Sequence, residues 1–303
     1  MLETSSPLMP TDTRFPRIAI VDIPGKGKGV IANEHIPRGT LIVSEKPSIT
    51  LPVNRSEMLK VLPALSQDDL SFLLSFPCGP NEDPILGRLK HFTPCIGDDA
   101  AGLCPTICRV NHTCYSPKAS PNAAYFWSVS AKQEELRAIK EIHEGQEIEC
   151  SCKGCARPAA ERHASKQRIL AYNDFVRRLP LRFGQDHPLQ ILKDIETQIL
   201  IVCEEGYSSE VGARAHDVFQ LCAYYGDAAS ARQWEEICRD CHALYQGSKS
   251  EVFDKAQRLA ARPQDFRVWE GLGRRKLRGP VCCFLCMSMI DYNADKLEEQ
   301  ASP

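Results

Sequence analysis

Asn111-His112-Thr113-Cys114 and Cys150-Ser151-Cys152-Lys153-Gly154-Cys155 are the two stretches that decide how this sequence folds. The second places three thiols within six residues, and Gly154 permits the tight turn that lets three sulfurs surround one tetrahedral zinc ion. Cys114 is the best candidate for the fourth ligand. Cysteines this close without a metal would repel one another as anions or remain reactive thiols, so the spacing favours zinc over unliganded thiols.

The composition is that of an ordinary globular protein. The 303 residues are 43% hydrophobic and 25% charged, and the net charge of −2 gives no reason to expect direct nucleic-acid binding. A basic run at 274–278 is interpreted as a solvated face, with an interaction patch as the alternative. No stretch approaches the roughly 20 apolar residues of a membrane span, and residues 1–16 lack a secretory signal. We therefore expect a protein of the nucleus, the cytoplasm or both, whose 15 cysteines are thiols or metal ligands rather than disulfides.

Hydrophobic patterning divides the chain into three parts. Residues 1–16 are a tail rich in Ser, Thr and Pro that we expect to be disordered. Residues 17–155 contain short apolar runs separated by turn residues, which predict a strand-rich domain with a helical insert at about 56–90. Residues 156–303 carry apolar side chains at helical spacing, and Gly226-Asp227 has the residues of a helix C-cap followed by an N-cap.

Two local predictions concern the strand-rich part. Residues 104–110 have a strand-like pattern that leads into Asn111. Residues 143–145 have the composition of a hairpin turn between strands at 136–142 and 146–149.

The order of several short motifs resembles the SET domain of protein-lysine methyltransferases. Each motif is modest alone, but the ordered set is specific and spans about residues 18–155. The nearest subgroup is the fungal relatives of the SET and MYND methyltransferases, here lacking the MYND zinc finger. The motifs are Gly25-Lys26-Gly27-Lys28-Gly29-Val30, Ile36-Pro37-Arg38-Gly39, Glu45-Lys46-Pro47, Arg109-Val110-Asn111-His112-Thr113-Cys114, Ser120-Pro121-Asn122-Ala123 and Ile142-His143-Glu144-Gly145-Gln146-Glu147-Ile148.

The resemblance implies an α+β fold: a SET fold of short β-strands with a pseudoknot and a post-SET zinc site at residues 17–155, followed by an α-helical C-terminal region at 156–303. It implies S-adenosyl-L-methionine as cofactor, zinc as structural metal, and methyl transfer to a lysine amine of a protein substrate. Glycines of the first motif would let backbone amides approach the cofactor. The residues so implied are Lys26, Gly27, Lys28, Gly29, Asn111 and His112 for the cofactor, and Cys114, Cys150, Cys152 and Cys155 for zinc.

Two departures from the family pattern concern activity. Residues 115–120 are inserted between motifs that lie nearly adjacent in relatives. More seriously, Glu149 runs directly into Cys150, where active relatives carry a tyrosine that orients the lysine amine and an aromatic residue against adenine. Transfer depends on aligning the amine with the methyl donor, so this loss should reduce it severely. Tyr115 and Tyr125 are interpreted as core or surface residues rather than substitutes.

The function therefore has two candidate forms. No catalytic residue is identified, and the resemblance favours a lysine methyltransferase over a catalytically inactive protein-interaction module. A genuine pseudoenzyme and a chain that lost a segment through an incorrect splice assignment are both consistent with the gap after Glu149. The resemblance also allows association with chromatin, and no membrane partner is expected.

The other cysteine groups favour structural roles. Cys238 and Cys241 lie on the apolar face of an expected helix, which favours core packing over a metal-binding pair. Cys282, Cys283 and Cys286 fall in an apolar run, interpreted as a packed terminal segment rather than a second metal site.

Overall fold

The chain is described from a computed structural model, for residues 14–79, 82–92, 96, 100–114, 121–152, 159–205 and 207–280. It divides into two compact units, one with Met1–Thr113 and Pro121–Cys150 and the other with Cys114–Ser120 and Ser151–Pro303. Most of the predicted tail at 1–16 and the three cysteines at 282–286 lie outside the described residues.

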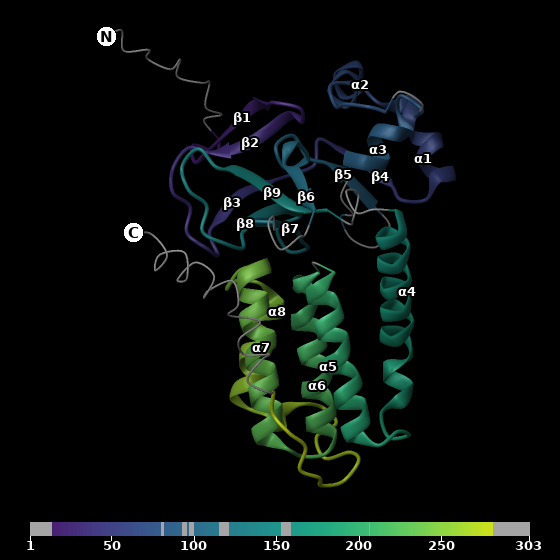
Figure 1. Cartoon of the computed structure of the whole chain (residues 1–303), viewed down its shortest axis with the longest axis vertical. Helices are drawn as coiled ribbons and strands as arrows, with labels where there is room; N and C mark the ends of the chain where they lie inside the picture. Colours follow the sequence, from purple (N-terminus) through teal and green to yellow (C-terminus); the bar gives the residue numbers. More distant parts are fainter. Residues whose placement is uncertain are drawn as a thin grey trace. The chain divides into compact units, whose positions relative to one another are not determined.

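Short strands in three small sheets build most of the first unit (Figure 1). The alternation of buried and more exposed side chains along them is that of strands with one face on a core. The sheets, in strand order, are β1 (Ile18–Ile23), β2 (Gly27–Ala32), β9 (Glu147–Cys152) and β6 (Asn111–Cys114); β3 (Leu41–Glu45), β8 (Gln133–Ala138) and β7 (Ala123–Ser128); and β4 (Ile49–Pro52) and β5 (Ala100–Leu103).

Two matching turns join these sheets. Ile36 and Ile142 exchange backbone hydrogen bonds of 2.8 and 3.0 Å, and each is followed three residues later by a glycine with positive φ, +82° at Gly39 and +78° at Gly145. The turn predicted at 143–145 is present, but the hairpin is wrong. Strand β8 pairs with β3 and β7 whereas β9 pairs with β2, so the chain changes sheets at this turn.

The predicted strand at 104–110 is also wrong. Its centre is a 3₁₀ helix, η2 (Ile107–Arg109), and the buried carboxylate of Glu45 accepts hydrogen bonds from the backbone N–H groups of Thr106 and Ile107 at 2.8 and 2.7 Å. Those two N–H groups are therefore satisfied by a side chain instead of a neighbouring strand.

Helices of the insert pack together with strands β4 and β5. Asn54 and Ser66 cap the first two α-helices through their side-chain oxygens. Leu73, Phe76 and Leu103 are fully buried at the centre of this small core. The elements are α1 (Arg55–Val61), η1 (Leu62–Ala64), α2 (Gln67–Leu74) and α3 (Leu86–Phe92).

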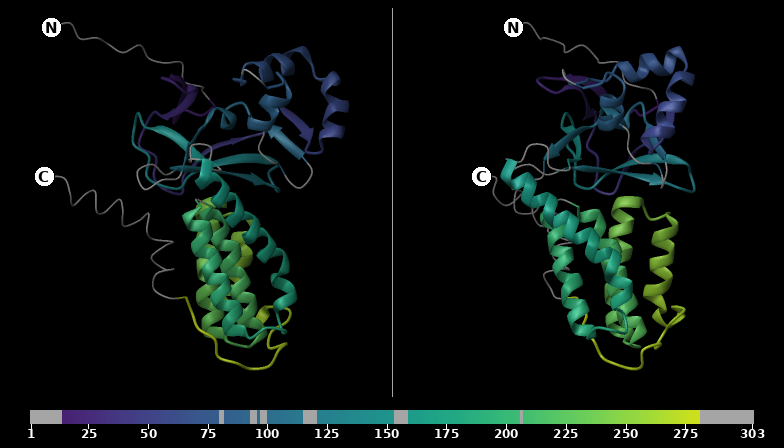
Figure 2. Two further views of the ribbon diagram at one scale, coloured as in Figure 1. Left: turned by 45° about the vertical axis from the view of Figure 1, so that its right-hand side comes forward. Right: turned by 90° about the vertical axis from the view of Figure 1, so that its right-hand side faces the viewer.

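The second unit is helical, and its long helices lie side by side (Figures 1 and 2). Gly226 has φ of +67° and Asp227 accepts from Ser230 N–H, which confirms the predicted cap pair between two of the helices. None of the described helices is both long and apolar enough to span a bilayer. The elements are α4 (Ala159–Arg182), α5 (Pro188–Glu204), η3 (Ser208–Glu210), α6 (Val211–Tyr224), α7 (Ala228–Gln246), α8 (Glu251–Ala261) and η4 (Pro263–Asp265).

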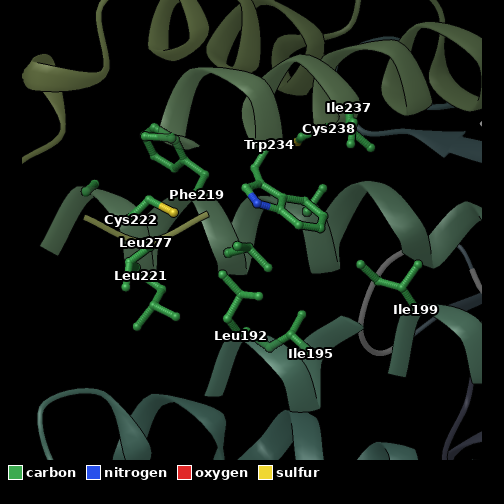
Figure 3. Close-up of a cluster of buried hydrophobic side chains, with 14 of the residues drawn as sticks. Leu192, Ile195, Ile199, Phe219, Leu221, Cys222, Trp234, Ile237, Cys238 and Leu277 are labelled. Atoms are coloured by element: carbon green, nitrogen blue, oxygen red, sulfur yellow. The ribbon is translucent and has the colours of Figure 1, made fainter. Parts of the chain in front are cut away.

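Trp234 lies at the centre of the helical core, fully buried among aliphatic and aromatic side chains (Figure 3). Its indole N–H donates to the Arg278 carbonyl oxygen at 3.2 Å, so the polar atom of this buried side chain is satisfied. Cys238 and Cys241 are both buried in the same core, as the helical spacing predicts. The predicted α+β fold class, with a strand-rich part followed by a helical part, is the fold class observed.

Candidate functional site

A cavity of about 780 Å³ opens in the first unit, a size typical of small-molecule sites. Three segments far apart in sequence line it: Asp22 with residues 26–28, residues 75–79 with Glu82 and Phe92, and residues 108–112. Of the residues predicted to hold a cofactor, Lys26, Gly27, Lys28, Asn111 and His112 are in the lining, whereas Gly29 is not.

Glycine opens the backbone at the first wall of the cavity. Gly25 and Gly27 have φ of +76° and +78°, and a Cβ at either would meet no atom within 4 Å. Positive φ suits glycine and disfavours other residues. The turn between β1 and β2 therefore presents backbone that side chains do not cover.

Gly29 serves a different purpose from the glycines of the turn. A Cβ there would lie 2.5 Å from Ile23 Cγ1 and 2.7 Å from Asn111 Nδ2. Asn111 Nδ2 in turn donates to Glu147 Oε1 at 2.8 Å. The missing side chain at Gly29 thus gives Asn111 the space in which it bonds to β9.

Lys26 joins the glycine turn to the same strand. Its ammonium group lies 2.7 Å from a carboxylate oxygen of Glu147 and 2.7 Å from one of Glu149. The hydrogen bonds to Glu147 and then Glu149 raise the pKa of Lys26 above its ordinary value. The cationic group is therefore directed at β9, while Lys28 pairs with Asp22 at 2.9 Å.

His112 contacts the first cysteine of the cysteine-rich segment. Its Nδ1 lies 2.9 Å from Cys150 Sγ, and Cys150 is buried in β9. Removal of water from around the ring lowers the pKa of His112, although the residue as a whole is exposed.

Sequence reasoning missed the wall formed by the helical insert. The guanidinium carbon of Arg109 lies 4.1 Å from the Phe76 ring centroid, and Arg109 Nη2 donates to Ser75 Oγ at 2.6 Å. Arg109 is part of the sequence motif that contains Asn111. The sequence pattern did not predict that the residues after α2 contact Arg109. That contact is between residues more than thirty positions apart.

The predicted zinc ligands are only partly described. Cys150 lies buried in β9, and Cys114 and Cys152 belong to the neighbouring strands β6 and β9. Cys155 lies outside the described residues, as does the insertion at 115–120. The nearby Asn122 side chain bonds along one edge of β9, donating to Glu147 O at 2.9 Å and accepting from Glu149 N–H at 2.9 Å.

Comparison with known proteins places these features in a family context. The family model "SET domain" matches residues 27–153. Histone-lysine N-methyltransferase set5 of Schizosaccharomyces pombe is 26% identical over 285 residues, which cover 84% of this chain and 86% of the relative. A solved structure described as a histone methyltransferase of Plasmodium falciparum is 16% identical in sequence. The match covers 45% of this chain and 91% of the solved chain, with a TM-score of 0.28.

Proposed function

We propose that the cavity binds S-adenosyl-L-methionine, from the premise that residues 27–153 match the SET domain. The observation that carries the proposal is the meeting of the glycine turn with Asn111 and His112 around one cavity. These are the segments in which the family places its cofactor contacts.

The residues around the cavity suit the chemistry of that cofactor. Uncovered backbone at Gly27 can hydrogen-bond a polar amino-acid group, and Arg109 offers a positive charge to its carboxylate. Phe92 gives apolar surface for an adenine ring. The bound cofactor would supply a methyl group on a sulfonium, and the work of these residues is to hold and orient it.

Asn111→Ala tests the cofactor site. The variant loses the side chain that bonds Glu147, and we expect its affinity for S-adenosylmethionine to fall roughly tenfold or more, by isothermal titration calorimetry. Asn33→Ala is the matched control. Asn33 lies outside the cavity lining, and its side chain donates a hydrogen bond to the Pro16 carbonyl oxygen. A wild-type chain that takes up no cofactor would contradict the proposal.

We further propose that the bound methyl group goes to a lysine amine of a protein substrate. The histone-lysine methyltransferase among the relatives makes a histone, and hence chromatin, the first substrate to test, and the nucleus or cytoplasm the expected location. The second candidate is an inactive SET-like interaction module. It is favoured by the direct step from Glu149 to Cys150 and by the lack of a tyrosine among the described residues that line the cavity.

Radiolabelled methyl transfer separates the two candidates. Wild-type chain incubated with histones, and separately with a protein lysate, is expected to label lysine, and Asn111→Ala to label it far less. Cofactor binding in calorimetry without any transfer would reject the enzyme and leave the interaction module.

We propose zinc bound by Cys114, Cys150, Cys152 and Cys155. Four thiolates match a structural zinc site, and support comes from the neighbouring positions of β6 and β9. The family's pseudoknot is proposed at the same place, supported by the two Asn122 bonds to the edge of β9.

Cys150→Ser tests the zinc site. Metal analysis of the purified chain should show about one equivalent of zinc less than wild type, because serine is a poor zinc ligand. Cys222→Ala, which also removes a buried thiol, is the control and should leave the zinc content unchanged. Equal zinc in Cys150→Ser and wild type would count against the four-cysteine site.

A further inference from the structure

Three side chains of types that can bind metals meet inside the helical unit. His216 is on α6, and Glu235 and Cys238 are on α7. One potential ligand atom from each lies within 4.8 Å of the other two. Glu235 is fully buried, Cys238 is 2% exposed, and His216 is half-buried.

Local packing of the two helices explains why these side chains meet. Glu235 and Cys238 are three positions apart, so they share one face of α7. Gly212 lies one turn before His216 on α6, and a Cβ there would be 3.1 Å from Cys241 Cβ. Glycine at this position lets α7 come close to α6, which brings the face of α7 to His216. Cys238 is labelled beside Trp234 and Ile237 in Figure 3.

His216 and Glu235 contact one another directly. Both carboxylate oxygens of Glu235 lie near His216 Nδ1, at 3.0 and 2.9 Å. A fully buried carboxylate is costly unless a nearby positive charge or a metal ion compensates it. The Cys238 sulfur lies within 4.8 Å of the potential ligand atoms of His216 and Glu235.

A divalent ion would satisfy the three groups together. Its two positive charges balance one carboxylate and one thiolate, while imidazole binds in its neutral form. The site would then carry no net charge in the core. Nitrogen, oxygen and sulfur donors together are typical of zinc and of metals with similar preferences.

We propose that His216, Glu235 and Cys238 bind a zinc-type divalent ion in the helical unit, with the fourth position open to water or to His242. His242 is one turn beyond Cys238 on α7, and its Nε2 is 3.5 Å from where a Cβ on Gly212 would lie. The alternative is a buried ion pair of His216 with Glu235 and no metal. This site is independent of the cofactor cavity and of the four-cysteine zinc.

Glu235→Gln and Cys238→Ser in the full-length chain test the site. Each should lower bound zinc by about one equivalent per chain relative to wild type. The glutamine keeps the size of the side chain and accepts a hydrogen bond from His216, so this variant is expected to fold, as checked by circular dichroism. Cys222→Ala is the control, since it removes a buried thiol of the same core outside the cluster and should keep the full zinc content.

The two proposed zinc sites can be tested independently of one another. If Glu235→Gln lowers zinc by about one equivalent in both the wild-type and the Cys150→Ser background, the helical site stands whatever the fate of the four-cysteine site. Cobalt(II) added to metal-free chain carrying Cys150→Ser, Cys152→Ser and Cys155→Ser should give thiolate charge-transfer absorption that Cys238→Ser abolishes. Unchanged zinc in folded Glu235→Gln, or no cobalt–thiolate absorption, would overturn the helical site in favour of the ion pair.

Discussion

Replacing Gly29 with alanine is expected to lower the affinity for S-adenosylmethionine by roughly tenfold or more and to destabilise the fold by about 1–3 kcal/mol. The added methyl group would lie 2.5 Å from Ile23 Cγ1, 2.7 Å from Asn111 Nδ2 and 3.1 Å from Glu147 Oε1. No arrangement keeps all three neighbours in place, because Ile23 is in the paired strand β1 and Asn111 is fixed by its bond to Glu147. Displacement of Asn111 would carry the effect into the cavity wall.

Gly39→Ala is the matched control for this effect. Gly39 has φ of +82°, and a methyl group added there would meet open space, so alanine strains the backbone without crowding any side chain. This variant should lose stability in a denaturant titration and keep its cofactor affinity in calorimetry. Wild-type affinity in a folded Gly29→Ala chain would show that the spacing of β2 and Asn111 does not govern cofactor binding.

The stability of the first unit is expected to fall as pH rises from about 4.5 to about 8, because of a pair of buried carboxyl groups. Glu45 and Glu134 are directly opposite one another on β3 and β8, 7% and 1% exposed. Burial, and then the charge of Glu45, raise the pKa of Glu134 to about 8 from 4.5. Burial also raises the pKa of Glu45, against the opposing effect of its two backbone hydrogen bonds.

The sign follows from proton uptake on folding. Since the folded-state pKa of Glu134 lies above that of the unfolded chain, the folded state binds the proton more tightly. Its stabilising contribution is complete below pH 4.5 and is lost as pH passes through about 8. The shift corresponds to a loss on the order of 5 kcal/mol in the free energy of unfolding over that range.

Glu134→Gln should flatten this pH dependence, since glutamine stays neutral in a similar volume. Urea titrations at several pH values between 4 and 9, followed by a probe in the first unit, measure it. Glu144→Gln, at an exposed carboxylate on a turn, is the control and should keep the wild-type slope. A wild-type chain whose stability is unchanged or rises toward pH 8 would contradict the raised pKa of Glu134.

The strands and helices could be predicted where their cause is local. The turn glycine Gly145, the cap pair Gly226-Asp227 and the helical spacing of Cys238 and Cys241 all depend on residues a few positions apart, and each is observed as predicted. Predictions failed where a distant side chain intervened. Residues 104–110 leave the strand conformation because Glu45, about sixty residues earlier, accepts their N–H groups.

The residue types, spacing and order of the short motifs between Gly25 and Cys155 determined the likeness to the SET domain, whose family model matches residues 27–153. Only the tertiary structure brought Phe76 onto Arg109, Gly29 against Asn111, and Glu45 opposite Glu134. It likewise joined His216 with Glu235 and Cys238. Spacing along the chain fixes local backbone geometry, whereas contacts between distant side chains depend on sheet pairing and helix packing that no local pattern specifies.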